Sequence, residues 1–259
     1  MSAAPMPVAV NTFREAVRDR VLYNLVFFAL LMIGAAILVG QISIGIDRLV
    51  IVNLGLTAIS LFGLVMAIFI GVGLVSKEIE KRTLYSLLAQ PIRRWEFLVG
   101  KYAGLVLTLA VNTSFMTLGL AAALFYVGRP FVRTDALILV AVYFILLELA
   151  LVTALALFFS CFSSPMLSTL FTLGIYVTGI FASDIRGFGE LTKSSALKTV
   201  TKVVYYLVPN FHNFNAIAAA SHGESIPLSL IGQNTLYAVL YVALLLVAAS
   251  AVFSSRNLK

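Results

Sequence analysis

Charge, cysteine and histidine are all scarce in this sequence. Only 11% of its 259 residues are charged and 61% are hydrophobic, which excludes a soluble globular domain of ordinary composition. Cys161 is the only cysteine, so an internal disulfide framework is excluded, and two histidines leave little material for a structural metal site. The only Gly-Lys pair, Gly100-Lys101, is followed by Tyr102, so the phosphate-binding pattern G-x-x-x-x-G-K-[ST] is missing. We therefore expect no enzyme activity, no bound cofactor and no metal site in this chain.

What the sequence has in abundance is long apolar runs. Stretches of about 18 or more residues without an ionisable group recur, and each is long enough to cross a bilayer core of roughly 30 Å. Helices are the natural form for these stretches, because lipid offers no partner to a bare backbone amide. The sequence therefore predicts an all-α integral membrane protein with one transmembrane domain, residues 21–253. Its six predicted spans are residues 21–40, 50–75, 102–127, 136–159, 166–182 and 235–253.

The first 20 residues carry a positively charged amphipathic segment. Its two faces at helical spacing are Val10, Phe13, Ala16 and Val17 on one side, and Arg14, Glu15, Arg18 and Asp19 on the other. This pattern is typical of a helix that lies in the membrane interface with its apolar face in lipid. It is equally compatible with a charged anchor for the first span. No cleavage site follows a short apolar core, so we do not expect a signal peptide.

Lysine and arginine are distributed unequally between the two sides of this arrangement. Eleven of the 18 fall on the side that holds both termini and residues 77–101, and seven fall on the other side. Because short cytoplasmic segments are enriched in these residues, the side with eleven is predicted to be cytoplasmic. The tail, 254–259, then lies in the cytoplasm. Residues 183–234 are predicted to form an outer loop of short helices at the membrane surface.

The segment 77–101 is unusually charged for this chain, with six Lys or Arg and three Glu in 25 positions. Leu84, Leu87 and Leu88 form an apolar edge, and Pro91 is expected to end that helix and begin a second one. The apolar edge of the second helix is Ile92, Trp95, Leu98 and Val99. Two short helices with a fixed elbow are suited to enter a groove on a soluble partner. The alternative is a polybasic patch that binds anionic lipid.

Four groups in this segment carry a family resemblance: Glu80-Lys81-Arg82-Thr83, Leu87-Leu88-Ala89-Gln90-Pro91, Arg93-Arg94-Trp95 and Gly100-Lys101. The pattern resembles the coupling region of permease subunits of type-2 ATP-binding-cassette (ABC) exporters. It is most similar to the branch that includes the permease of nitrous-oxide reductase maturation. Arg82 departs from the pattern, because many relatives have Gly there.

The resemblance implies a multi-pass permease of a bacterial cytoplasmic (inner) membrane, which forms the translocation path as a homodimer or with a related partner. A separate ATPase subunit, carrying ATP and Mg, would drive it, and no nucleic acid is expected as a partner. The residues implied to contact the ATPase are Glu78, Glu80, Arg82, Thr83, Leu87, Leu88, Pro91, Arg93, Arg94 and Trp95.

Polar residues inside the predicted spans form a second set of candidates. The small-residue stripe Ser60, Gly63, Ala67 and Gly71 favours close helix packing over pore lining. Two further stripes would either face a translocation path or hydrogen-bond between helices: Thr108 and Asn112 in the third span, and Ser168, Thr172 and Tyr176 in the fifth.

Glu148 is the one ionisable residue predicted to lie deep in a span, where a bare carboxylate is costly. We interpret it as a structural hydrogen-bonding acid, with a substrate or proton site as the alternative. A proton site would suit a secondary carrier, which is the competing function. Given the branch resembled, His212 and His222 could be copper ligands, but their spacing favours ordinary surface histidines.

Overall fold

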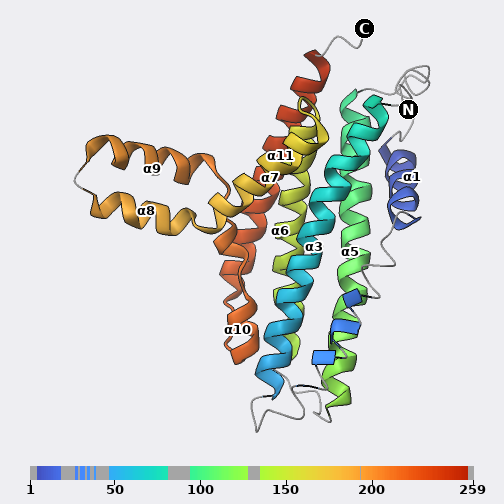
Figure 1. Ribbon diagram of the computed structural model, residues 1–259, viewed down its shortest axis with the longest axis vertical. Coiled ribbons are helices and arrows are strands. Elements are labelled where there is room, and N and C mark those ends of the chain that lie inside the picture. Colours follow the sequence, from blue (N-terminus) through green and yellow to red (C-terminus); the bar gives the residue numbers. More distant parts are fainter. Residues whose placement is uncertain are drawn as a thin grey trace.

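The computed structural model describes residues 5–18, 47–80, 94–127, 135–192 and 194–255, together with some of the residues between 27 and 38. The regular elements in these parts of the chain are all helices (Figure 1). Predicted span 21–40 lies largely outside the described residues. Within it, Phe28 and Met32 are buried in the main hydrophobic core.

Four helices among the described residues are long and apolar enough to cross a membrane: α3 (Asp47–Glu80), α5 (Arg94–Tyr126), α6 (Ala136–Ser160) and α11 (Leu228–Ser255). They correspond to the predicted spans 50–75, 102–127, 136–159 and 235–253. Figure 1 shows them side by side as an elongated bundle. The end of α3, the start of α5 and the end of α11 lie at the same end of this bundle.

The predicted fifth span is shorter than a membrane is thick. Helix α7 (Pro165–Ile180) has 16 residues, which at 1.5 Å per residue is about 24 Å. It then bends by 58° into α8 (Ala182–Leu191). The described residues therefore contain four candidate spans, or five if the bent pair is one span. The six predicted spans are not established by these helices.

Helices α3 and α6 pack closely against each other in the core. A Cβ built on Gly63 would stand 2.5 Å from a methyl of Leu149, and one built on Gly71 would stand 2.8 Å from the Cβ of Ala156. Ala67, between the two glycines, is fully buried. The small side chains let the two backbones approach, as is usual between membrane helices. At one end of this pair, Arg48 of α3 forms a 2.6 Å ion pair with Asp135, just before α6.

Helix α1 (Pro5–Arg18) runs lengthwise beside α5 (Figure 1). Gly104 of α5 lies against the backbone oxygen of Ala9 and the side chain of Thr12, which is 2% exposed. The sequence predicted this helix, and its place in the membrane interface stays a prediction. The structure adds that it packs against α5, where Gly104 leaves room for the α1 backbone.

The described residues between 182 and 222 form four short helical elements before α11 begins. They are α8, α9 (Ser195–Leu207), the 3-10 turn η2 (Phe211–Phe214) and α10 (Ile217–His222). Figure 1 shows α8 and α9 as a hairpin that leaves the bundle sideways between its two ends, whereas α10 lies toward the end where α3 begins. Short helices are what the sequence predicted for this stretch, and its place at the outer membrane surface stays a prediction.

Candidate functional site: a buried carboxylate between three helices

Glu148 lies midway along α6, 12 residues from each end, and is 8% exposed. Its carboxylate oxygen Oε1 accepts a 2.8 Å hydrogen bond from the hydroxyl of Tyr176 on α7. The Ser60 side chain of α3 lies beside the Tyr176 hydroxyl. Side chains from α3, α6 and α7 therefore meet here, and the Tyr176 hydrogen bond supplies the partner that a buried acid requires.

The polar stripe on α7 leads to this acid. Ser168 and Thr172 are fully buried, and the Thr172 hydroxyl donates a 2.7 Å hydrogen bond to the Ser168 carbonyl oxygen. The Ser168 hydroxyl has no hydrogen-bond partner within the described part of the chain. Residues spaced by four lie on one helical face, so Tyr176 belongs to the same face as the two hydroxyl side chains. The structure thus brings the predicted stripe and Glu148 together through Tyr176.

The predicted stripe on α5 is also buried but separate from Glu148. Thr108 donates a 2.9 Å hydrogen bond to the Gly104 carbonyl oxygen, within its own helix. The Nδ2 of Asn112 donates to the sulfur of Met66 on α3 at 2.7 Å, and thioether sulfur is a weak acceptor. Asn112 Oδ1 has no partner among the described residues. This amide links α5 to α3, and sequence patterns gave no signal for Met66 as its partner.

Tyr176 also connects the buried acid to the segment that follows the hairpin. Its ring lies 5.0 Å from the ring of Phe211, the first residue of η2. Gly179, one turn further along α7, lies directly against the Pro209 carbonyl oxygen and the Phe211 ring, so a side chain has no room there. The backbone amide of Asn210 donates a 2.9 Å hydrogen bond to Tyr237 of α11. The spacing of polar residues could not reveal this connection, because Phe211 is apolar and distant in sequence.

The predicted ATPase-contacting residues are only partly described. The backbone of Glu78 and Glu80 forms the last turn of α3, and Arg94 begins α5. Trp95 is 47% exposed at the start of α5. The remaining candidates lie outside the described residues: Arg82, Thr83, Leu87, Leu88, Pro91 and Arg93.

One feature of the predicted coupling element is wrong. The second short helix is not separate, because α5 continues without a break from Arg94 to Tyr126. Leu98, expected on an edge open to a partner, is 1% exposed and belongs to a second buried cluster that includes Leu157 and Phe253. The Phe97 ring stacks on that of Phe253 with centroids 6.5 Å apart. The start of α5 is therefore fixed to the ends of α6 and α11.

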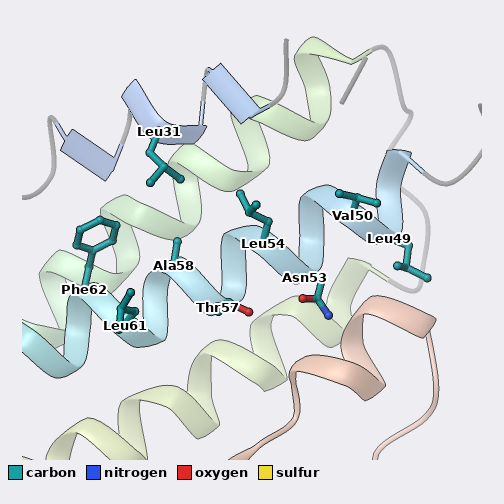
Figure 2. Close-up of a pocket in the computed structure, with 9 residues that line it drawn as sticks. All are labelled: Leu31, Leu49, Val50, Asn53, Leu54, Thr57, Ala58, Leu61 and Phe62. Carbon is teal, nitrogen blue, oxygen red and sulfur yellow. The ribbon is translucent and has the colours of Figure 1, made fainter. Parts of the chain in front are cut away.

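A groove of about 550 Å³ runs along the exposed face of α3. Its lining residues are Leu31, Leu49, Val50, Asn53, Leu54, Thr57, Ala58, Leu61 and Phe62. Figure 2 shows Asn53 and Thr57 projecting from α3 on the side away from Leu31. The groove is apolar apart from these two side chains, and neither Glu148 nor Tyr176 lines it.

The described residues contain no group of three metal-binding side chains, and His212 and His222 are both exposed.

Long apolar helices packed through small residues, with a hydrogen-bonded acid at mid-bundle, define a multi-pass helical membrane protein. Residues 6–258 match the family described as ABC-2 family transporter protein, and the chain belongs to this family. It is thus the membrane component, or permease, of an ABC transporter. A comparison with individually curated proteins gives no match.

Proposed function

We propose that this permease works as an exporter, that two copies, or one copy and a related chain, form the path, and that a separate ABC ATPase drives transport. The observation that carries the proposal is the family match over residues 6–258. The motif at residues 80–101 supports the exporter branch and a place in a bacterial cytoplasmic membrane. The competing secondary carrier is not favoured by this family membership.

The geometry of the coupling end supports transmission of force. Residues 81–93 connect α3 directly to α5, and both helices continue into the membrane domain. Because Phe97 and Leu98 pack on the ends of α11 and α6, a displacement of the coupling segment would be passed to four helices together. Interiors packed in this way transmit displacement because they are nearly incompressible.

The exposed face of α3 supports a second copy. Asn53 and Thr57 lie on this face within the span and are both exposed. Exposed polar side chains are unfavourable in hydrocarbon, so this face is better suited to a protein contact or to a water-filled path than to lipid. In contrast, Thr108, Asn112, Ser168 and Thr172 are buried within one copy, and we assign them to helix packing.

The decisive experiment is recovery of the ATPase on the tagged permease. The ATPase is first identified by purification from the protein's own host, and two variants are then compared: Glu80→Lys, and Leu87→Ala combined with Leu88→Ala. Losing one member of a close interfacial charge pair costs about 2 to 5 kcal/mol, and each buried Leu contributes roughly 2 kcal/mol. Both variants should elute as single peaks in detergent while recovering much less ATPase.

Neutralising Arg93 and Arg94 together provides the control for lipid binding. If residues 77–101 served mainly as a polybasic lipid patch, this variant would be the most affected, and ATPase recovery would be normal in all three. Full recovery of ATPase by the Glu80 and leucine variants would show that the coupling assignment is wrong.

A further inference from the structure

Lys101 of α5 is a buried cation near the coupling end of the bundle. It is 2% exposed, and no other lysine or arginine among the described residues is buried. Its Nζ lies 5.1 Å from the centre of the Phe97 ring, one turn earlier on the same helix. The ring face attracts the cation, but an ammonium has three N–H donors, so a buried lysine also requires oxygen acceptors.

The Lys101 side chain leans toward the last turn of α11. Side chains on a helix point toward its N-terminus, and the contact with Phe97 places Nζ about one turn before the Cα of Lys101. At that level the Phe97 ring stacks on Phe253 of α11, with centroids 6.5 Å apart and ring planes at 19°. Phe253 is the third residue from the end of α11. The ammonium therefore lies at the height of the last turn of α11.

Two helix C-termini converge beside this lysine. α6 and α11 both end next to the start of α5, and their last turns contribute to the buried cluster that includes Leu98. The C-terminal end of a helix carries partial negative charge and carbonyl oxygens that lack partners within the helix. At the end of α6, the carbonyl oxygens of residues 157–159 accept hydrogen bonds from residues 160–163. The last turn of α11 is therefore the better acceptor for the ammonium.

We propose that the Lys101 ammonium binds main-chain carbonyl oxygens in the last turn of α11, and that Lys101 is thereby the positioning residue that makes α11 follow the coupling segment. Apolar contacts such as those of Leu98 are not directional, so they permit one helix to slide along another. A hydrogen bond from a cation is directional and fixes the register of the two helices. The contact with α11 stands by itself, whereas the role in coupling rests on the proposed function.

Spin labels report whether α11 stays fixed to α5. In a Cys161→Ser background, cysteines replace the exposed Ala103 on α5 and Ala251 on α11, and the labelled chain is co-expressed with an excess of cysteine-free chain. Pulsed electron spin resonance in lipid nanodiscs then gives the distribution of distances between the two labels. We expect Lys101→Met, which keeps the length of the side chain but not its charge, to broaden this distribution at least twofold. Lys101→Arg should keep it narrow, because a guanidinium also donates to carbonyl oxygens.

Phe97→Leu is the matched control, because it keeps the ammonium and removes the stacked ring. Broadening in Phe97→Leu but not in Lys101→Met would show that the aromatic contact fixes α11, and equal widths in Lys101→Met and the unaltered protein would likewise overturn the proposal. If Lys101→Met loses its single elution peak in detergent while Lys101→Arg keeps it, the charge is required at this contact, as proposed. Loss of the peak in both variants would show that the site requires the packing of lysine and not its charge, which contradicts the proposal.

The role in coupling is tested on the complex with the ATPase. Because Lys101 is buried, the unaltered protein and Lys101→Met should recover equal amounts of ATPase. Trapping the nucleotide with vanadate should leave the distance between the labels unchanged in the unaltered protein and shift it in Lys101→Met. A shift in the unaltered protein, or none in Lys101→Met, would refute the coupling role. Failure of the unaltered protein to recover any ATPase would instead refute the proposed function, and the measurement on the isolated permease would still decide the contact with α11.

Discussion

Replacing Tyr176 by Phe removes the hydroxyl that donates the 2.8 Å hydrogen bond to Glu148, while the ring keeps its place against Phe211. A buried acceptor left without its donor costs about 1 to 3 kcal/mol. Glu148→Leu removes the other partner and leaves a neutral hydroxyl beside the polar Ser60 side chain, so this cost should be smaller. Glu148→Gln keeps an acceptor for the tyrosine and should change stability least.

The contact itself is measured by combining the two changes. Hydrogen bonds between membrane helices contribute about 0.6 kcal/mol on average and up to about 1.7 kcal/mol. The variant with both Glu148→Leu and Tyr176→Phe should therefore lose less unfolding free energy than the two single variants lose together. The difference, which is the coupling energy of the pair, should fall in this range. Each kcal/mol corresponds to a midpoint shift of roughly 2–4 °C for a chain of about this size.

Thermal unfolding in detergent, followed by the fraction that remains in the single elution peak, measures all four proteins. Additivity within about 0.3 to 0.5 kcal/mol would show that the two side chains do not interact. ATP hydrolysis by the complex with the ATPase supplies a functional readout. A well-folded Glu148→Gln protein with lost transport-linked hydrolysis would refute the structural role and identify Glu148 as a substrate or proton site.

Two further predictions concern packing and topology. Gly71→Leu should lower the unfolding midpoint strongly, because Ala156 leaves no room for a side chain and overpacking typically costs about 1 to 3 kcal/mol. Gly73→Leu is the control and should be tolerated, because no atom lies within 4 Å of a Cβ built there. Similar midpoints for the two variants would contradict the α3–α6 contact. In the Cys161→Ser background, a cysteine at Glu224 should react with an impermeant thiol reagent in intact cells and one at Ser86 only after permeabilisation. The reverse result would overturn the predicted orientation.

Most of the membrane architecture was predictable from the sequence. A helix in lipid must satisfy its own backbone, so a long uncharged run has one available structure, and α3, α5, α6 and α11 follow from it. The small-residue stripe with Gly63 and Gly71 was predicted as a packing face for the same kind of reason, since only small side chains let backbones approach. Glu148 was identifiable because a carboxylate in an apolar run is costly.

Which groups meet was decided by the tertiary structure. Periodicity assigns residues to a face of their own helix but does not identify the helix opposite, so it could not pair Glu148 with Tyr176, Asn112 with Met66, or Leu98 with the end of α11. Composition likewise could not show that α7 ends after 16 residues and bends by 58° into α8, or that Gly179 lies directly against the Pro209 carbonyl oxygen.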